Sequence, residues 1–415
     1  MNESEAADKP AKTAARSAGR DGGESIALME PLVLSESSPH RPALTDLALT
    51  LASRSAGLRR SLPEGVVIAL ASLVRSMNCY YSNLIEGHDT HPIDIERALK
   101  KDYSADPKKR SLQREAEAHI AVQKWIDDGG IKGRAVSVEG ILEIHRRFCE
   151  LLPADMLVVE HPATKEQLRV VPGEVRKYDV EVGAHVPVSA GALPRFLARF
   201  EEVYSKLGPS EIVLAAAAAH HRLAWIHPFL DGNGRVMRLM SYATLLETLE
   251  TGGVWSIARG LARSVDTYKG HLAACDVPRR NDLDGRGHLS EEALAEFTRY
   301  FLETCVDQVR FMEDLVQPDR LRVRIGRWVA EEVALGTLHE KSSTLLEAIL
   351  YRGEIPRGDV PRTLDVSERT ASRVVAALVE RGVLTSQTPK AALRISFPAT
   401  LASYWMPGLF PEQRE

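Results

Sequence analysis

Apolar residues recur at intervals of three and four along most of this chain, which is the spacing of one buried helix face. A first apolar run covers residues 212–225, and Ser210 with Glu211 before it suits a helix N-terminus. A second set of apolar positions follows at Val236, Leu239, Met240, Ala243 and Leu246. The pattern predicts two helices joined by a short loop, within a mainly helical fold.

Strand-like patterns are confined to two parts of the chain. Before residue 336 they occur only between residues 156 and 187, in the segments 157–159, 168–171 and 180–182. Because these segments are short and lie among helical patterns, we expect a small hairpin on a helical body.

After about residue 336 the pattern changes again. It predicts helices at 343–351, 357–364 and 368–381, followed by two short strands at 383–385 and 393–395 that flank a polar loop. This order resembles a winged helix-turn-helix.

The third of these helices would present Arg369, Thr370 and Arg373 outward as candidate DNA contacts. Residues 357–397 carry seven Arg or Lys against four Asp or Glu, a local net charge of +3 that is only mildly basic. DNA binding, protein docking and homodimerisation all remain open for this region.

Composition narrows the class of protein. With 44% hydrophobic and 27% charged residues and a net charge of −4, the chain has the make-up of a globular protein and not of a polyelectrolyte for nucleic acid. No apolar run approaches the roughly 20 residues of a membrane span, and no signal-peptide pattern opens the sequence. We expect a cytoplasmic protein with no membrane partner and reduced core thiols at Cys79, Cys149, Cys275 and Cys305.

The loop between the two predicted helices contains several residues whose side chains or backbone suit catalysis or anion binding. Residues 226–238 read Ile-His-Pro-Phe-Leu-Asp-Gly-Asn-Gly-Arg-Val-Met-Arg. A helix that starts after this loop offers unpaired N–H groups and a positive dipole end to an anion. Gly232 and Gly234 let that backbone approach a ligand, and Phe229 is expected to anchor the loop in the core.

Each polar residue of the loop has a chemical use. His227 titrates near neutrality and suits a general base. Asp231 is a hard oxygen ligand for Mg²⁺, and Asn233 can donate to a phosphoryl oxygen. Arg235 and Arg238 lie on the first helical turn, where both can clamp phosphates. The set indicates phosphoryl or nucleotidyl transfer.

Two competing motifs do not fit. A calcium loop needs a glutamate at its twelfth position, which from Asp231 is Tyr242, and a P-loop needs Gly-Lys-Ser/Thr. The stretch instead resembles the Fic active-site motif, His-x-Phe-x-Asp/Glu-Gly-Asn-Gly-Arg-x-x-Arg, at every fixed position. That resemblance implies a Fic-type helical bundle that transfers AMP from ATP, with Mg²⁺, to a Ser, Thr or Tyr hydroxyl of a target protein or of itself.

A second stretch, Ser82-Asn83-Leu84-Ile85-Glu86-Gly87, resembles the inhibitory motif of Fic proteins. Ser82 and Glu86 would share a helix face, and the resemblance implies that Glu86 pairs with Arg238. A carboxylate on Arg238 would remove a phosphate partner and repel ATP. From the bare sequence, the alternative is a solvent-exposed glutamate at a helix end.

The resemblance extends to the strand-like region and to one aromatic residue. Pro172-Gly173 followed by Arg176 and the 180–183 segment resembles the approach to the Fic flap, where a target protein presented as an extended segment would dock. The alternative is a plain hairpin packed on the bundle. Tyr268 is the candidate for contact with adenine, with core packing as its alternative.

These observations divide the chain into a disordered tail at 1–40, an N-terminal helical region at 41–130 carrying the inhibitory motif, a Fic catalytic core at 131–275, a helical extension at 276–335, a winged helix-turn-helix at 336–400 and a C-terminal tail at 401–415. Besides AMP transfer, two functions stay open. One is AMP removal with Glu86 orienting water, and the other is a DNA-binding regulator whose helical body only senses nucleotide.

Overall fold

A computed structural model describes residues 14–160 and 165–410 of the chain. The described part is mainly α-helical with a few short antiparallel strands, which confirms the predicted fold class. None of its helices is both long enough and apolar enough to span a membrane.

The helices are α1 Arg41–Arg60, α2 Glu64–Ile85, α3 Pro92–Leu99, α4 Pro107–Asp127, α5 Val138–Glu150, α6 Leu193–Tyr204, α7 Pro209–Ile226, α8 Asn233–Thr248, α9 Ala258–Arg263, α10 Val265–Ala274, α11 Glu291–Val316, α12 Pro318–Ala334, α13 Ser342–Arg352, α14 Val360–Leu364, α15 Glu368–Glu380 and α16 Ala402–Trp405. The strands are β1 Ala14–Ala18, β2 Val158–Glu160, β3 Gln167–Arg169, β4 Tyr178–Glu181, β5 Glu354–Ile355, β6 Leu384–Thr385 and β7 Leu393–Ile395.

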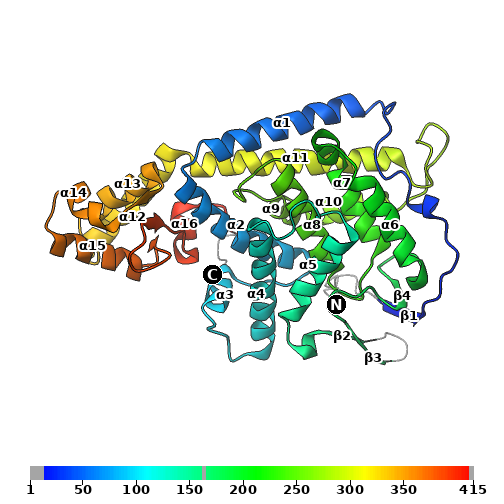
Figure 1. Cartoon of the computed structure of the whole chain (residues 1–415), viewed down its shortest axis with the longest axis horizontal. Helices are drawn as coiled ribbons and strands as arrows, with labels where there is room; N and C mark the ends of the chain where they lie inside the picture. Colours follow the sequence, from blue (N-terminus) through cyan, green and yellow to red (C-terminus); the bar gives the residue numbers. More distant parts are fainter. Residues whose placement is uncertain (1–13, 161–164, 411–415) are drawn as a thin grey trace, which may run out of the picture.

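The predicted helix pair α7 and α8 forms the centre of the body. The two helices pack on each other, and α7 also packs on α11, which runs alongside α1 (Figure 1). Helix α7 begins at Pro209, one residue before the predicted Ser210 cap, because proline is favoured in the first turn of a helix. Helix α2, which carries the inhibitory motif, packs against α4 and α9.

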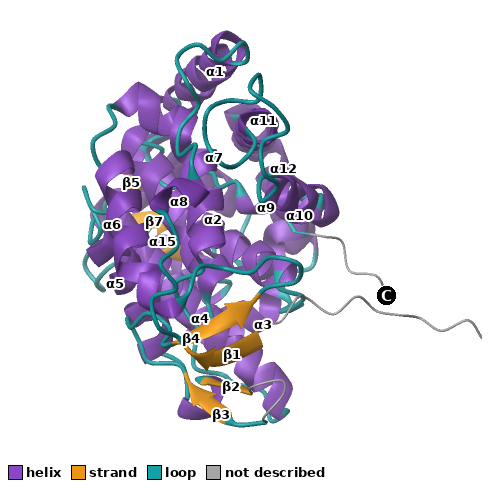
Figure 2. Cartoon of the chain, turned by 90° about the vertical axis from the view of Figure 1, so that its right-hand side faces the viewer, coloured by secondary structure: helices purple, strands orange, loops and turns teal. Residues whose placement is uncertain are grey.

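The strands β1 to β4 gather at one end of the helical body (Figure 2). Strands β2 and β3 pair antiparallel, with Val158 opposite Arg169. Strand β4 pairs antiparallel with β1 from the start of the described chain, with Ala14 opposite Glu181. One edge of the predicted flap strand is therefore occupied by the protein's own N-terminal segment.

The disorder predicted for residues 1–40 is wrong for the part that the structure describes, which starts at residue 14. Met29, Leu32 and Leu34 are buried. The Tyr204 hydroxyl donates to the Leu32 carbonyl at 2.6 Å, and Arg222 donates to the Pro31 carbonyl at 2.9 Å. A short apolar cluster inside a polar segment is enough to dock it on the core, although the average composition indicated disorder.

The C-terminal unit contains α13, α14 and α15 beside a three-stranded sheet ordered β5-β7-β6. The predicted third helix and last strand lie where expected, whereas β5 was not predicted because it is only two residues long. Residues 401–410, predicted as part of a tail, instead pack on the body. Trp405 and Leu409 are buried there, and the Tyr81 hydroxyl of α2 donates to the Leu409 carbonyl at 3.1 Å.

Candidate active site

The loop between α7 and α8 reverses the chain through two residues in the left-handed region. His227 ends α7 with a φ of 52°, and Gly232 precedes α8 with a φ of 82°. Glycine adopts that conformation without strain, whereas histidine needs the surrounding structure to impose it. The backbone geometry therefore holds His227 in one defined position at the end of its helix.

Asn233 closes this loop. Its amide donates to the Phe229 carbonyl at 2.8 Å, and its carbonyl oxygen accepts from the Phe229 backbone N–H at 2.9 Å. One of the two N–H donors of the side-chain amide is bonded to the loop itself, so Asn233 shapes the loop. The predicted hydrogen bond from Asn233 to a phosphoryl oxygen stays a prediction.

Phe229 is fully buried, as predicted for a core anchor. Its ring stacks on His145 of α5 with centroids 3.8 Å apart and an angle of 7° between the planes. The His145 Nδ1 atom accepts from the Gly173 backbone N–H at 2.9 Å. His145 therefore joins the motif loop to the segment before β4, a role that the sequence did not reveal.

Arg176 forms a second tie to the loop. Its Nε donates to the His227 carbonyl at 2.8 Å, and its backbone N–H donates to the Pro228 carbonyl at 2.8 Å. Its guanidinium also donates to the Val188 carbonyl at 2.5 Å. The position of His227 thus depends on the segment that leads into β4.

The His227 side chain lies in a nearly dry environment, with 8% of the residue exposed. Burial, together with the nearby Arg176 and His185 side chains, lowers the pKa of His227 to about 3. The imidazole is therefore neutral near pH 7 and can accept a proton.

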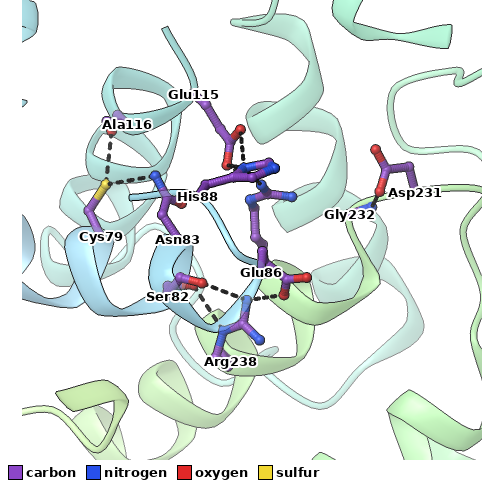
Figure 3. A network of polar contacts seen from close by, with 11 residues as sticks. Cys79, Ser82, Asn83, Glu86, His88, Glu115, Ala116, Asp231, Gly232 and Arg238 are labelled. Atoms are coloured by element: carbon purple, nitrogen blue, oxygen red, sulfur yellow. Dashed lines mark hydrogen bonds and ion pairs between the residues drawn. The ribbon is translucent and has the colours of Figure 1, made fainter. Parts of the chain in front are cut away.

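Arg238 is held by both residues of the predicted inhibitory motif (Figure 3). Its Nε donates to the Ser82 hydroxyl at 2.9 Å, and one terminal nitrogen donates to the Ser82 carbonyl at 3.2 Å. The same nitrogen forms an ion pair with the Glu86 carboxylate. Burial raises the pKa of Glu86, but Arg238 and Arg235 outweigh it and hold that pKa below its ordinary value. Glu86 is therefore an anion in this state.

The Glu86 carboxylate lies against the first turn of α8, beside Gly234. A Cβ atom added at Gly234, the second residue of α8, would meet the Glu86 Oε1 atom at 2.3 Å. Gly234 is therefore required for the approach of an anion to this helix end. In this state the anion is the protein's own carboxylate.

The first arginine of the motif has a different partner. Arg235 forms an ion pair with Glu115 of α4, and the two side chains are only 9% and 5% exposed. The His88 Nδ1 atom lies 3.1 Å from a Glu115 oxygen (Figure 3). The same atom lies 3.2 Å from the Arg235 guanidinium. Burial raises the pKa of Glu115, but Arg235 and His88 bring it down to about 2. Arg235 is thus committed to a buried carboxylate, which the sequence did not predict.

Asp231 is exposed, and one of its oxygens accepts from the Gly232 backbone N–H at 2.7 Å. Within residues 14–160 and 165–410, no group of three or more His, Cys, Asp or Glu side chains is placed to hold a metal ion. A lone exposed carboxylate fits a Mg²⁺ ion that arrives with phosphates, since Mg²⁺ binds through one or two carboxylates plus phosphate oxygens.

Residues 135–245 match the family model described as Fic/DOC family. This part of the chain is therefore similar to the Fic/DOC family. The match includes the whole motif 227–238, so the predicted resemblance of that stretch is confirmed.

Curated relatives of this chain carry the name protein adenylyltransferase Fic. The protein from Drosophila willistoni is 30% identical over 226 residues, which are 51% of this chain and 42% of that one. The protein from Drosophila erecta is 32% identical over 172 residues, which are 40% of this chain and 31% of that one. The chain thus spans less than half the length of these relatives. A solved Fic family protein from Desulfovibrio desulfuricans is 17% identical with a TM-score of 0.49, over 88% of this chain and 98% of that one.

Tyr268 is 1% exposed, and its hydroxyl lies 2.7 Å from the His220 Nε2 atom. The other ring nitrogen of His220 lies 2.8 Å from the Ser241 hydroxyl of α8. Core packing accounts for the burial of Tyr268, and the predicted contact with adenine stays a prediction.

The predicted DNA contacts lie on α15. Arg369 and Arg373 are exposed, whereas Thr370 is half-buried with its hydroxyl 3.2 Å from that of Ser367. DNA binding stays a prediction, and the two arginines are the residues available for it.

The Arg235–Glu115 pair leads to a prediction about stability. Glu115→Gln leaves Arg235 buried without a countercharge, and we expect it to lower the free energy of unfolding by about 3 kcal/mol. As a control at the C-terminal end of the same helix, Asp128→Asn removes an exposed pair with Lys124 and should cost less than about 1 kcal/mol. Urea denaturation followed by circular dichroism measures both. Equal effects of the two substitutions would contradict the buried ion pair.

Proposed function

We propose that this chain is an autoinhibited protein adenylyltransferase. The observation that carries the proposal is the Glu86 carboxylate against the first turn of α8, beside Arg238. A site that holds an anion there, a few residues from a neutral buried histidine, suits the phosphates of a nucleotide next to a general base. The curated relatives named protein adenylyltransferase support the same activity.

In the proposed reaction His227 accepts the proton of a Ser, Thr or Tyr hydroxyl on the target. The oxygen forms a bond to the α-phosphorus of ATP, the bond from that phosphorus to the bridging oxygen breaks, and pyrophosphate leaves with the electron pair. Backbone N–H groups at the start of α8 stabilise the charge that develops on the phosphoryl oxygens. The products are an AMP ester of the hydroxyl and pyrophosphate.

Mg²⁺ bound at Asp231 would neutralise phosphate charge. Arg238, once released by Glu86, pairs with the terminal phosphate of ATP. Glu86 and that phosphate cannot share one guanidinium without like-charge repulsion, so the braked and the nucleotide-bound states exclude each other.

The protein substrate is proposed to bind as an extended segment along β4. The segment that leads into β4 carries Arg176, which donates a hydrogen bond to the His227 carbonyl. The β4 edge that pairs with β1 is already occupied, so a target segment that uses this edge must first displace β1.

Incubation of the purified chain with Mg²⁺ and ATP labelled at the α-phosphorus tests the proposal. We expect label on the protein itself, an added mass of one AMP in intact-protein mass spectrometry, and release of pyrophosphate. Label from the γ-phosphorus in place of the α-phosphorus would contradict nucleotidyl transfer.

The lowered pKa of His227 predicts an unusual dependence on pH. A base works only when deprotonated, and a lowered pKa keeps it deprotonated in more acidic solution. We therefore expect kcat/KM to stay nearly constant from about pH 7.5 down to about pH 5.5, where an ordinary histidine would lose most of its activity. Initial rates of AMP transfer across this range measure it.

His88 needs a control in this experiment, because its hydrogen bond to Glu115 raises the pKa of His88. The same profile is measured in His88→Gln. A loss of activity centred near the ordinary histidine pKa of about 6.5 in both proteins would show that His227 is not held neutral by its surroundings.

A further inference from the structure

The site contains two arginine–carboxylate pairs that differ in how easily they can open. Arg235 and Arg238 lie on the first turns of α8 and pair with Glu115 and Glu86 respectively. Glu86 is 30% exposed, whereas Glu115 is 5% exposed. A carboxylate that leaves Arg238 returns to water, but an arginine that leaves Glu115 abandons a buried charge, which costs far more.

The two carboxylates also differ in their supports. Glu86 is the C-cap of α2, and Gly87 follows it with a φ of 80°, so a change of the helix end can carry Glu86 away. Glu115 stands in the middle of α4, with intact helix on both sides. Glu115 is therefore the fixed partner and Glu86 the displaceable one.

His88 strengthens the fixed pair. Its Nδ1 atom contacts both Glu115 oxygens, at 3.1 and 3.3 Å, and the Arg235 guanidinium at 3.2 Å. The aromatic ring of Phe148 lies against the same guanidinium, 5.5 Å from ring centroid to Arg235 Cζ. Because these groups surround the Arg235 guanidinium, a phosphate can reach it only if the surrounding side chains move.

We propose that Arg235 is a positioning residue, held by Glu115 in both the braked and the open state, and that Arg238 alone is released to the nucleotide. Arg235 fixes the first turn of α8 to α4. The backbone N–H groups of that turn therefore keep their orientation toward the nucleotide phosphates when Glu86 leaves. This inference rests on the proposed nucleotide site and assigns different tasks to the two arginines of the motif.

The test uses the full chain with Glu86→Gly, and measures binding of the α,β-methylene analogue of ATP with Mg²⁺ by calorimetry. This analogue cannot transfer its AMP. Removing the whole pair with Arg235→Met and Glu115→Leu leaves the net charge unchanged, and we expect the Kd to stay within roughly threefold. Arg238→Met should weaken binding by roughly 10- to 100-fold, since it loses a charged hydrogen bond to phosphate.

The second readout is kcat for self-modification with ATP. Because the paired substitution releases the first turn of α8, we expect kcat to fall by roughly 10²-fold while Kd is kept. A purely structural role would leave both values unchanged in the folded variant. A loss of affinity equal to that of Arg238→Met would make Arg235 a phosphate ligand, and either result overturns the inference.

A milder pair, Arg235→Gln with Glu115→Gln, keeps an amide hydrogen bond and replaces the first pair if that variant does not fold. The same expectations apply to it. If the Glu86→Gly chain itself does not bind the analogue, the nucleotide site is contradicted and the inference falls with it. Binding of the analogue to the Glu86→Gly chain therefore tests the proposed nucleotide site by itself, and the further variants test only the different roles assigned to the two arginines.

Discussion

Replacing His227 with alanine is expected to slow AMP transfer by roughly 10²- to 10⁴-fold, because the target hydroxyl loses the group that accepts its proton. The lowered pKa keeps the His227 imidazole neutral. The left-handed backbone at residue 227 and the hydrogen bond from Arg176 hold the base in one position. The measurement is the rate of label transfer from ATP in the Glu86→Gly background, so that the brake does not mask the effect.

The control for this experiment is His40→Ala. His40 precedes α1, and its side chain forms no capping hydrogen bond with that helix. This variant should transfer AMP at the starting rate. If His227→Ala, folded by circular dichroism, also transferred AMP at the starting rate, the assignment of His227 as the base would be wrong.

Replacing Glu86 with glycine is expected to raise self-modification by roughly 10- to 100-fold, the factor that corresponds to one charged hydrogen bond at the site. The substitution frees Arg238 and removes the carboxylate that lies against the first turn of α8. Intact-protein mass spectrometry after incubation with Mg²⁺ and ATP gives the fraction of chains that carry AMP as a function of time.

Glu150→Gly is the matched control, since Glu150 is an exposed glutamate at the C-terminal end of another helix, α5. It should modify itself at the wild-type rate. The brake would be contradicted if Glu86→Gly and Glu150→Gly behaved alike. If wild type removed AMP from a pre-modified chain and Glu86→Gly did not, Glu86 would serve the hydrolysis of the AMP ester, in which it orients water.

The parts of this site that carry a local sequence pattern could be predicted. The helix pair around residues 226–233 follows from apolar spacing and two glycines. The pairing of Glu86 with Arg238, 152 positions away, could be predicted only because the segment around Glu86 resembles a known motif. Both predictions depend on local patterns that can be recognised in a single sequence.

Contacts between distant segments that carry no such motif could not be predicted. Glu115 is 120 positions from Arg235, and a glutamate on a helix has no local mark that it is buried. The stacking of His145 on Phe229 and the bond from Arg176 to the His227 carbonyl join segments 51 or more positions apart. Only packing of α4 and α5 on α8 brings such groups together.

Composition was misleading where an average concealed a small apolar cluster. Residues 19–40 are polar overall, yet Met29, Leu32 and Leu34 dock the segment on the body. Asn233 and Tyr268 show a related limit. Their side chains suit a nucleotide, but a single sequence does not reveal that Asn233 also bonds to its own loop and that Tyr268 contacts His220.

The central claim is that the Glu86 carboxylate and a nucleotide phosphate compete for the first turn of α8. A crystal structure of Glu86→Gly with Mg²⁺ and the α,β-methylene analogue of ATP tests it most directly. The account predicts phosphate oxygens within hydrogen-bond distance of the Gly234 backbone N–H and the Arg238 guanidinium, with Arg235 still on Glu115 and the α-phosphorus facing His227. Phosphates bound elsewhere, with the N-terminus of α8 left to solvent, would contradict it.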